Sequence, residues 1–441
     1  MHQSTVMDGS AAGAVPRGAR RNAAIGLITL SLFTGTAARY VLSPMQELVS
    51  ADLGLGNHQI ALLQGMALAL PILLISIPLG RLVDRTNRTR LMIVLALICA
   101  AGSVLCALAQ DFATAFIARM LVAGSVVAAQ PASLSLVADL CEPSQRGRMI
   151  TLTSLGQVAG STVAYILAGM LLPWIPTVLP AGSALAGLAP WRLVLLMFAA
   201  VVLATAAALL CMREPVRREA SADSSGDLRV TLRALWAYRR FLLPLVGGLV
   251  AVAMADAAAA IWAVPVLTRH FHQTPADFGV WMGLLNLGSG VVGAVLGGLS
   301  ADFGQRRRGR GGVLLGAVVA TVLSVPTALF PLMPDVAWFG VSLALLLTCG
   351  GCANIAATAA IMVVLPNQLR GICVSLVVAA GGMAAFGIAP LLVSIAAQLF
   401  GRDGDILVPL SCVGIITSIL ASAGFLRAMQ VAGKANQQET I

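Results

Sequence analysis

Charge is scarce in this sequence. Only 10% of its 441 residues are charged and 59% are hydrophobic, whereas soluble domains carry about 25% charged residues. A soluble globular protein is therefore excluded. The net charge of +10 is not accompanied by a folded soluble module with a basic face, so nucleic-acid binding is excluded as well.

The residue patterns of enzymes are also missing. The sequence has no nucleotide-binding loop, no cluster of metal ligands and no Ser/His/Asp set, so we expect no catalysis, no cofactor and no metal. Cys349 and Cys352 have the spacing of a redox motif but lie inside an apolar run. We interpret them, like the other six cysteines, as small apolar packing residues.

Long apolar runs are abundant. Twelve of them approach or exceed the roughly 20 residues that a bilayer-spanning helix needs, six on each side of a charged linker. The sequence predicts an all-α membrane protein with twelve transmembrane helices in two pseudo-symmetric six-helix bundles. We expect an N-terminal tail at 1–22, bundles at 23–212 and 241–428, the linker at 213–240 and a C-terminal tail at 429–441.

The arginines predict the orientation. The first apolar run continues past signal-peptide length, so the N-terminus is interpreted as a cytoplasmic tail. If alternate loops are cytoplasmic, 23 of the 28 Lys and Arg residues lie on that side. Positive loops stay in the cytoplasm, which predicts a multi-pass inner-membrane protein with both termini inside. The other five are Arg39, Arg119, Arg192, Arg269 and Arg402.

The loop between the second and third runs has a distinctive pattern. It resembles the signature loop of the major facilitator superfamily, Gly-x-Leu-x-Asp-Arg-x-Gly-Arg-Arg, and Asn87 stands where that family has Gly. The matching residues are Gly80, Leu82, Asp84, Arg85 and Arg88. The resemblance implies a transporter in which Asp84 acts as a latch on the cytoplasmic side. Alternatively, these charges only anchor the topology.

The second half repeats parts of this pattern. Its equivalent loop keeps Asp302 but has Phe303 where Arg is usual. Two later loops each place a Pro before an Arg-Gly pair, and these pairs begin at Arg146 and Arg370. We assign Asp302 and Arg146 to the gating group, together with Gly80, Asp84, Arg85 and Arg88.

The first 200 residues resemble the spinster-like branch of the superfamily more closely. The resemblance rests on Arg39, Ala51-Asp52-Leu53-Gly54-Leu55, Ala118-Arg119 and Arg146-Gly147-Arg148. That branch has acids near both intramembrane arginines, where this chain has Ala38 and Val126. We therefore carry over the fold and the two arginine positions, but not the proton coupling or the lipid-type substrates.

Charged groups inside a span should face a cavity or a partner, because exposure to hydrocarbon costs at least about 2.5 kcal/mol. Arg39 and Arg119 have no nearby acid in their own helices, so the two guanidiniums are predicted to clamp a carboxylate or phosphate. The alternatives are snorkelling of Arg39 to the headgroups, and bonding of Arg119 to backbone carbonyls or to Glu47.

Asp256 is the only acid well inside the spans of the second half. A carboxyl at mid-membrane depth can load and release a proton, so Asp256 is the candidate coupling residue. The alternatives are a static salt bridge to Arg39 or Arg119, or a neutral acid bonded to a carbonyl.

Other polar residues inside spans are candidates to line the substrate path, although interhelical hydrogen bonding is an equally common use. We select Gln157, Asn286 and Asn354. The small-xxx-small patterns at Gly156/Gly160 and Gly293/Gly297 predict close helix packing and rocking surfaces.

These features favour a monomeric secondary transporter that works in the lipid bilayer by alternating access. We expect a small organic anion as the substrate and protons as candidate coupling ions. One alternative is efflux of amphipathic or lipid-like compounds. A second alternative is a non-transporting receptor or scaffold, which would not need the two gate-like loops.

Overall fold

The computed structural model describes residues 18–178, 187–215, 228–400 and 405–438. Within these ranges, side chains are described except at residues 19, 75–81, 84–85, 143, 228–232 and 434–438. The described chain contains helices and no strand. Twelve of its stretches are long and apolar enough to cross a membrane.

The first half supplies six of these stretches. Helices α1 and α2 form the first, and α3, the π-helical turn η1 and α4 form the second. The bounds are α1 Gly18–Tyr40, α2 Leu42–Leu53, α3 Asn57–Ala61, η1 Leu62–Met66, α4 Ala67–Arg85, α5 Arg88–Leu108, α6 Phe112–Leu140, α7 Pro143–Val178 and α8 Pro190–Leu209.

The second half supplies the other six, after a short helix α9 in the region predicted as linker. Its eleventh stretch contains a π-helical turn, η3, as the second stretch contains η1. The bounds are α9 Leu228–Ala237, α10 Arg239–Arg269, α11 Pro275–Gly312, α12 Leu315–Thr327, η2 Phe330–Leu332, α13 Val336–Val364, α14 Asn367–Gly382, η3 Met383–Ile388, α15 Ala389–Phe400 and α16 Leu407–Gln438.

The first stretch is longer than the span predicted from the first apolar run, residues 23–43. It extends from Arg20 to Leu53, because α2 follows α1 after the single residue Val41. Pro44 is the third residue of α2, where a backbone N–H has no partner within the helix, so proline is tolerated there. Arg39 therefore lies near the middle of the stretch and not close to its end.

Two equivalent helices of the two halves, α6 and α13, begin with the same aspartate cap, as expected for an internal duplication. The side chain of Asp111 accepts a hydrogen bond from the backbone N–H of Thr114 at the start of α6 (2.9 Å). Asp335 accepts one from Trp338 at the start of α13 (2.8 Å). Both carboxylates cap orphan N–H groups, at equivalent positions of the fourth and tenth stretches.

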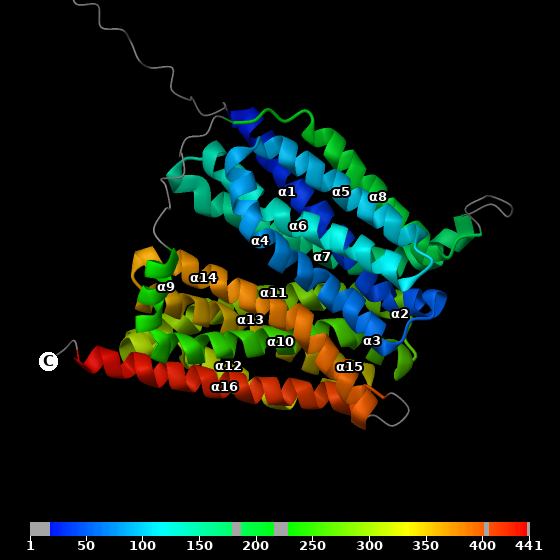
Figure 1. Cartoon of the computed structure of the whole chain (residues 1–441). Coiled ribbons are helices and arrows are strands. Elements are labelled where there is room, and N and C mark those ends of the chain that lie inside the picture. The colour runs from blue at the N-terminus through cyan, green and yellow to red at the C-terminus, as the bar shows by residue number, and fades with distance from the viewer. Residues whose placement is uncertain (1–17, 179–186, 216–227, 401–404, 439–441) are drawn as a thin grey trace, which may run out of the picture.

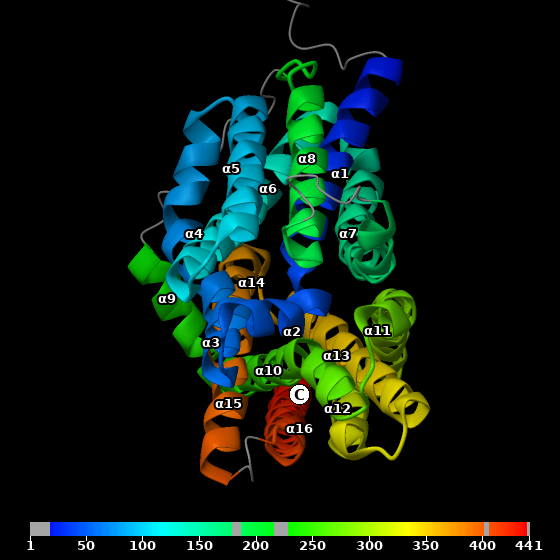
Figure 2. The same cartoon turned by 90° about the vertical axis from the view of Figure 1, so that its right-hand side faces the viewer.

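The two bundles stand side by side (Figures 1 and 2). The start of α1, the end of α16 and helix α9 lie on one side of the protein, called the terminal side here (Figure 1). The connection from α2 to α3 and the connection from α10 to α11 lie on the opposite side.

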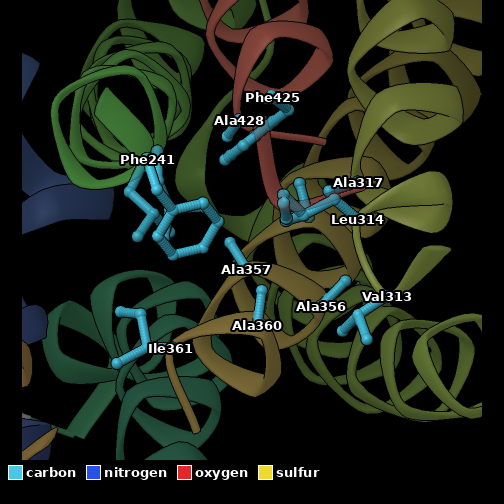
Figure 3. Close-up of a cluster of buried hydrophobic side chains, with 14 of the residues drawn as sticks. Phe241, Val313, Leu314, Ala317, Ala356, Ala357, Ala360, Ile361, Phe425 and Ala428 are labelled. Carbon is cyan, nitrogen blue, oxygen red and sulfur yellow. The ribbon is translucent and has the colours of Figure 1, made fainter. Parts of the chain in front are cut away.

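Small residues let the helices of each bundle pack closely. Figure 3 shows the core of the second bundle, where two phenylalanines, Phe241 and Phe425, lie among alanines of α13, α12 and α16. Gly156 and Gly160 pack against α1, and Gly293 and Gly297 pack against α13. The predicted close packing is confirmed, but these contacts lie within bundles. These glycines therefore do not lie on the surfaces where one bundle meets the other, as the rocking role would require.

Tight contacts between the bundles lie in the half towards the opposite side. Gly169 of α7 lies so close to Pro275 and Gly279 of α11 that a Cβ on it would be 2.6 Å from the Pro275 carbonyl oxygen. Gly283 likewise packs against the backbone of Thr162. The glycine backbones therefore close the two bundles together on the opposite side.

Candidate functional site

A cavity of about 210 Å³ opens in the first bundle between α1, α6 and α7. Polar groups on its wall come from threonine, arginine, tyrosine, glutamine and serine side chains, and three valines supply apolar surface. The lining residues are Thr36, Arg39, Tyr40, Val126, Val127, Gln130, Gln157, Val158 and Ser161.

Arg39 is the charged residue of this cavity. Its guanidinium lies 5.4 Å from the ring centres of both Tyr40 and Phe386, which are favourable cation–π distances. Phe386 belongs to η3, so one of the two rings comes from the other bundle. The buried Nε atom of Arg39 has no hydrogen-bond partner among the described residues.

Arg119 is placed differently from the predicted clamp. Its side chain is only 3% exposed and does not line this cavity. It donates to the backbone carbonyl of Arg39 (2.8 Å) and to Oε1 of Gln64 (2.9 Å). Bonding to a backbone carbonyl, one alternative from the sequence, is thus observed, while Glu47 pairs with Arg269 instead.

A chain of buried amides continues from Arg119 into the second bundle. Gln64 of η1 donates to Oε1 of Gln46 (3.0 Å). Gln46 of α2 in turn donates to the backbone carbonyl of Ile261 in α10 (2.8 Å). Gln46 was not among the predicted site residues, because it lies beyond residue 43, where the first span was predicted to end. A predicted first span that continued to Leu53 would have included Gln46.

Asp256 lies in the middle of α10, half-buried, with its carboxylate against Gly350 of α13. Any larger residue at position 350 would collide with that carboxylate. Within the described chain Asp256 has no ion pair and no hydrogen bond. The alternatives of a salt bridge to Arg39 or Arg119, or of a bond to a carbonyl, are therefore not observed.

Only one of the three candidate amides joins Arg39. Gln157 lines the same cavity. The side chain of Asn286 instead donates to the carbonyl of Met282 in its own helix (3.0 Å). Asn354 is exposed on α13, away from this cavity. The structure thus brings Arg39 and Gln157 together, and leaves Asn286 and Asn354 apart from them.

Arg88 is the buried arginine of the predicted gating group. Its side chain is 2% exposed and forms ion pairs with Asp139 at the end of α6 and with Glu214 after α8. These contacts join three elements of one bundle. Burial opposes ionisation of Glu214, but hydrogen bonds from Thr89 and Arg88 outweigh it and lower the pKa of that carboxyl.

Side chains are described for only some of the other gating residues. Gly80, Asp84 and Arg85 lie outside the residues whose side chains are described. Asp302 is exposed and has no ion pair within the described chain. Arg146 donates to the carbonyl of Ala138 (3.1 Å), and the equivalent arginine of the second half, Arg370, donates to that of Leu365 (2.9 Å).

An ion pair joins the bundles on the opposite side. Arg269 at the end of α10 contacts both carboxylate oxygens of Glu47 in α2, at 2.8 and 2.9 Å. It also donates to Oδ1 of Asn57 at the start of α3 (2.6 Å). This pair was not predicted, because its members are 222 residues apart in the sequence.

The sequence profile of the Major Facilitator Superfamily matches residues 28–390. The chain belongs to this superfamily. Its two pseudo-symmetric six-helix bundles are the fold of these secondary transporters, so the chain is a multi-pass membrane transporter for small molecules. No curated protein matches the sequence.

Solved transporters share the fold over nearly the whole chain. A bacterial homologue of the human lysosomal transporter spinster, in an inward-facing unoccupied conformation, superposes with a TM-score of 0.81 at 19% identity. The match covers 95% of this chain and 99% of that one. The nucleoside transporter NupG gives a TM-score of 0.67 at 14% identity, with 93% and 99% covered. At these identities the comparison carries the fold alone.

Proposed function

We propose that this transporter carries a small organic anion, bound by Arg39 in the cavity of the first bundle. The observation that carries the proposal is the position of this guanidinium. It lies on the cavity wall near the middle of the first membrane-spanning stretch, 5.4 Å from the centres of two aromatic rings, with a buried Nε that has no partner among the described residues. A carboxylate or phosphate satisfies such a group with paired, charge-assisted hydrogen bonds.

The surroundings of Arg39 support anion binding. Its neighbours in the cavity wall include Gln130, Gln157, Thr36 and Ser161, which supply hydrogen-bond donors and acceptors but no negative charge. In this proposal, Arg119 acts as a positioning residue. By bonding the carbonyl of Arg39 it fixes the backbone from which the binding arginine projects.

The cavity also favours a second candidate, efflux of amphipathic compounds. Val126, Val127 and Val158 form an apolar wall in the same cavity as Arg39. A substrate with an acidic group and an apolar body would use both surfaces. Counterflow in proteoliposomes with short carboxylates, phosphate esters and acidic amphiphiles separates the two candidates, because only a class that binds is exchanged.

The test of the binding role is substitution of Arg39. We expect Arg39→Gln to weaken the apparent substrate affinity about 10- to 100-fold, because hydrogen bonds to charged groups contribute about 1.5–3 kcal/mol. Arg39→Lys should recover part of that affinity, since an ammonium keeps the charge but not the planar two-point contact. Arg90→Lys, an exposed arginine at the start of α5, is the matched control. Unchanged affinity in Arg39→Gln contradicts the proposal.

We further propose that Asp256 couples transport to protons. It is a half-buried carboxylate in the middle of α10 without an ion-pair partner in the described chain. Burial without a counter-charge favours the neutral form of a carboxyl. Its protonation can therefore follow the changes in hydration that accompany alternating access.

Asp256→Asn separates coupling from binding. We expect the variant to lose transport driven by a pH gradient and to keep substrate counterflow, which needs no net proton movement. Glu142→Gln, an exposed acid between α6 and α7, is the control. Accumulation driven by a pH gradient in Asp256→Asn contradicts the coupling role, and loss of counterflow as well indicates a structural role.

The orientation and state of the protein complete the proposal. The arginine distribution supports an inner-membrane protein with its terminal side in the cytoplasm. Closure of the opposite side by Glu47–Arg269 then corresponds to an inward-facing state, and transport requires this pair to open. Labelling of introduced cysteines at positions 185 and 224 from opposite sides of the membrane tests the orientation. Native mass spectrometry tests the expected monomer.

A further inference from the structure

Phe386 of the second bundle reaches into the first bundle. Its side chain packs against a buried cluster formed by Ala67 and Leu68 of α4 and Ala123 of α6. It also packs against a larger cluster that includes Ala389 of its own bundle. Phe386 therefore fills a space between the bundles. The part of the wall that belongs to α4 and α6 stays with the first bundle when the two bundles separate.

This space adjoins the proposed anion site. The Arg39 guanidinium lies 5.4 Å from the centre of the Phe386 ring and 5.4 Å from that of Tyr40. Tyr40 belongs to α1, as Arg39 does, whereas Phe386 belongs to η3. Separation of the bundles therefore removes one of the two aromatic contacts of Arg39 and keeps the other.

The backbone allows Phe386 to come this close. A Cβ on Gly65, in the π-helical turn η1, would lie 2.3 Å from the backbone carbonyl oxygen of Phe386, which is in the π-helical turn η3. Any side chain at position 65 would therefore push Phe386 away from the first bundle. π-Helical turns are rare and are frequent at functional sites, and here two of them meet beside Arg39.

The walls left by Phe386 combine one positive charge with apolar surface. Arg39 supplies the charge, and Ala67, Leu68 and Ala123 supply the apolar part. Exposure of that apolar part to water costs free energy unless another apolar group replaces the ring. A ligand that fits therefore carries a negative charge and an apolar group of the size of a phenyl ring.

We propose that the transported anion is an arylalkanoate, whose ring takes the place of the Phe386 ring while its carboxylate pairs with Arg39. This inference rests on the proposed function, which supplies the anion and its arginine, and it names the substrate class. The side chain of Phe386 is a benzyl group, and phenylacetate is a benzyl group that carries a carboxylate.

Two related ligands fit less well. In benzoate the ring is joined directly to the carboxylate, so it points straight away from a guanidinium that pairs with both oxygens. At least one methylene group is needed to bring the ring back beside Arg39. In cyclohexylacetate a saturated ring fills the apolar space but offers no π face to the guanidinium.

The test measures half-saturation concentrations for counterflow in proteoliposomes of the full chain. We expect the value for phenylacetate to be at least about 10-fold lower than that for acetate, because the ring is buried. It should be about 3-fold lower than that for cyclohexylacetate, because only the aromatic ring makes a cation–π contact. The value for benzoate should also exceed that for phenylacetate. A value for acetate, cyclohexylacetate or benzoate that equals or falls below that for phenylacetate overturns the proposal.

Phe386→Ala tests the place of the ring. Removal of the competing side chain should lower the half-saturation concentration of phenylacetate about 3-fold and leave that of acetate unchanged, because acetate has no group that reaches the vacated space. Phe400→Ala, at the 82% exposed end of α15, is the matched control and should change neither. An unchanged value for phenylacetate in Phe386→Ala, or an equal change for both anions, overturns the proposal. If Phe386→Ala does not fold, the comparison of ligands on the parent protein decides.

Arg39→Gln separates the substrate class from the anion site. Weakening of every exchanged carboxylate in Arg39→Gln, without a preference for phenylacetate in the parent protein, overturns the arylalkanoate class and supports the anion site. Exchange of phosphate esters alone has the same meaning. Half-saturation concentrations that are equal in Arg39→Gln and the parent overturn the anion site and, with it, the arylalkanoate class.

Discussion

Neutralising Glu47 tests whether the opposite side is held shut by its ion pair. Glu47 and Arg269 make a two-point contact across the bundles, with side chains 16% and 36% exposed. Exposed pairs contribute about 0.2–1 kcal/mol, and the two-point geometry and partial burial favour the upper end. We therefore expect Glu47→Gln to weaken closure by about 1 kcal/mol, which is roughly a 5-fold increase in the open population.

The assay is alkylation of a single cysteine by a membrane-impermeant maleimide added from the opposite side. Ala61→Cys in an otherwise cysteine-free protein provides the site, because Ala61 is fully buried in a cluster that includes residues of both bundles. The labelling rate follows the open fraction. Glu47→Gln should raise it about 5-fold at low salt, with a smaller increase at high salt, where the pair is already screened.

Asp52→Asn is the matched control. Asp52 and Arg192 also form an ion pair on the opposite side, at 2.7 Å, but both belong to the first bundle. Breaking that pair does not loosen the contact between the bundles, so the labelling rate should remain that of the parent. An unchanged or lower rate in Glu47→Gln, or an equal increase in both variants, would refute the assignment of Glu47–Arg269 as a closing contact.

Two further predictions concern packing and pH. Gly169→Ala should increase the labelling rate of Ala61→Cys and slow transport, because its Cβ would lie 2.6 Å from the Pro275 carbonyl oxygen. Gly147→Ala is the control in the same helix. It has open space around it and should change neither rate. The lowered pKa of Glu214 means that its contribution to stability is present above its ordinary value of 4.5 and is lost as the pH falls through the lower folded value. The unfolding temperature should therefore drop below about pH 4.5, and by less in Glu214→Gln, whereas an equal drop in both would contradict this assignment.

The fold could be predicted from the sequence because the bilayer leaves few alternatives. Long apolar runs must form helices that satisfy their own backbone groups, and the charged break at the middle of the chain separates two equal halves. The signature loop at Gly80–Arg88 indicated the superfamily. Helix ends were harder to predict, since the polar residues Gln46 and Glu47 hide the continuation of the first helix as far as Leu53.

The partners of the site residues could not be predicted. Arg39 and Gln157 were selected by their depth and polarity, and they share a cavity. Bonding of Arg119 to a backbone carbonyl was one of the predicted alternatives. Its actual partners, Gln64 and the Arg39 carbonyl, could not be identified because those contacts depend on how α6, η1 and α1 meet. The role of Gly350 could not be predicted either, because it depends on the Asp256 carboxylate of another helix, which packs against this glycine only in the folded chain.

The ring of Phe386 should make the anion affinity of the proposed binding site different in the two states of a transport cycle. Phe386 lies in the second bundle, 5.4 Å from the Arg39 guanidinium, so it leaves when the bundles part on the opposite side. A cation–π contact contributes about 0.5–2 kcal/mol, so an anion that competes with the ring binds more tightly after it has left. The Michaelis constants for entry from the two compartments should then differ severalfold. If no second ion is coupled, detailed balance requires the empty carrier to favour the ring-bound, low-affinity face more strongly than the loaded carrier does, by the same factor.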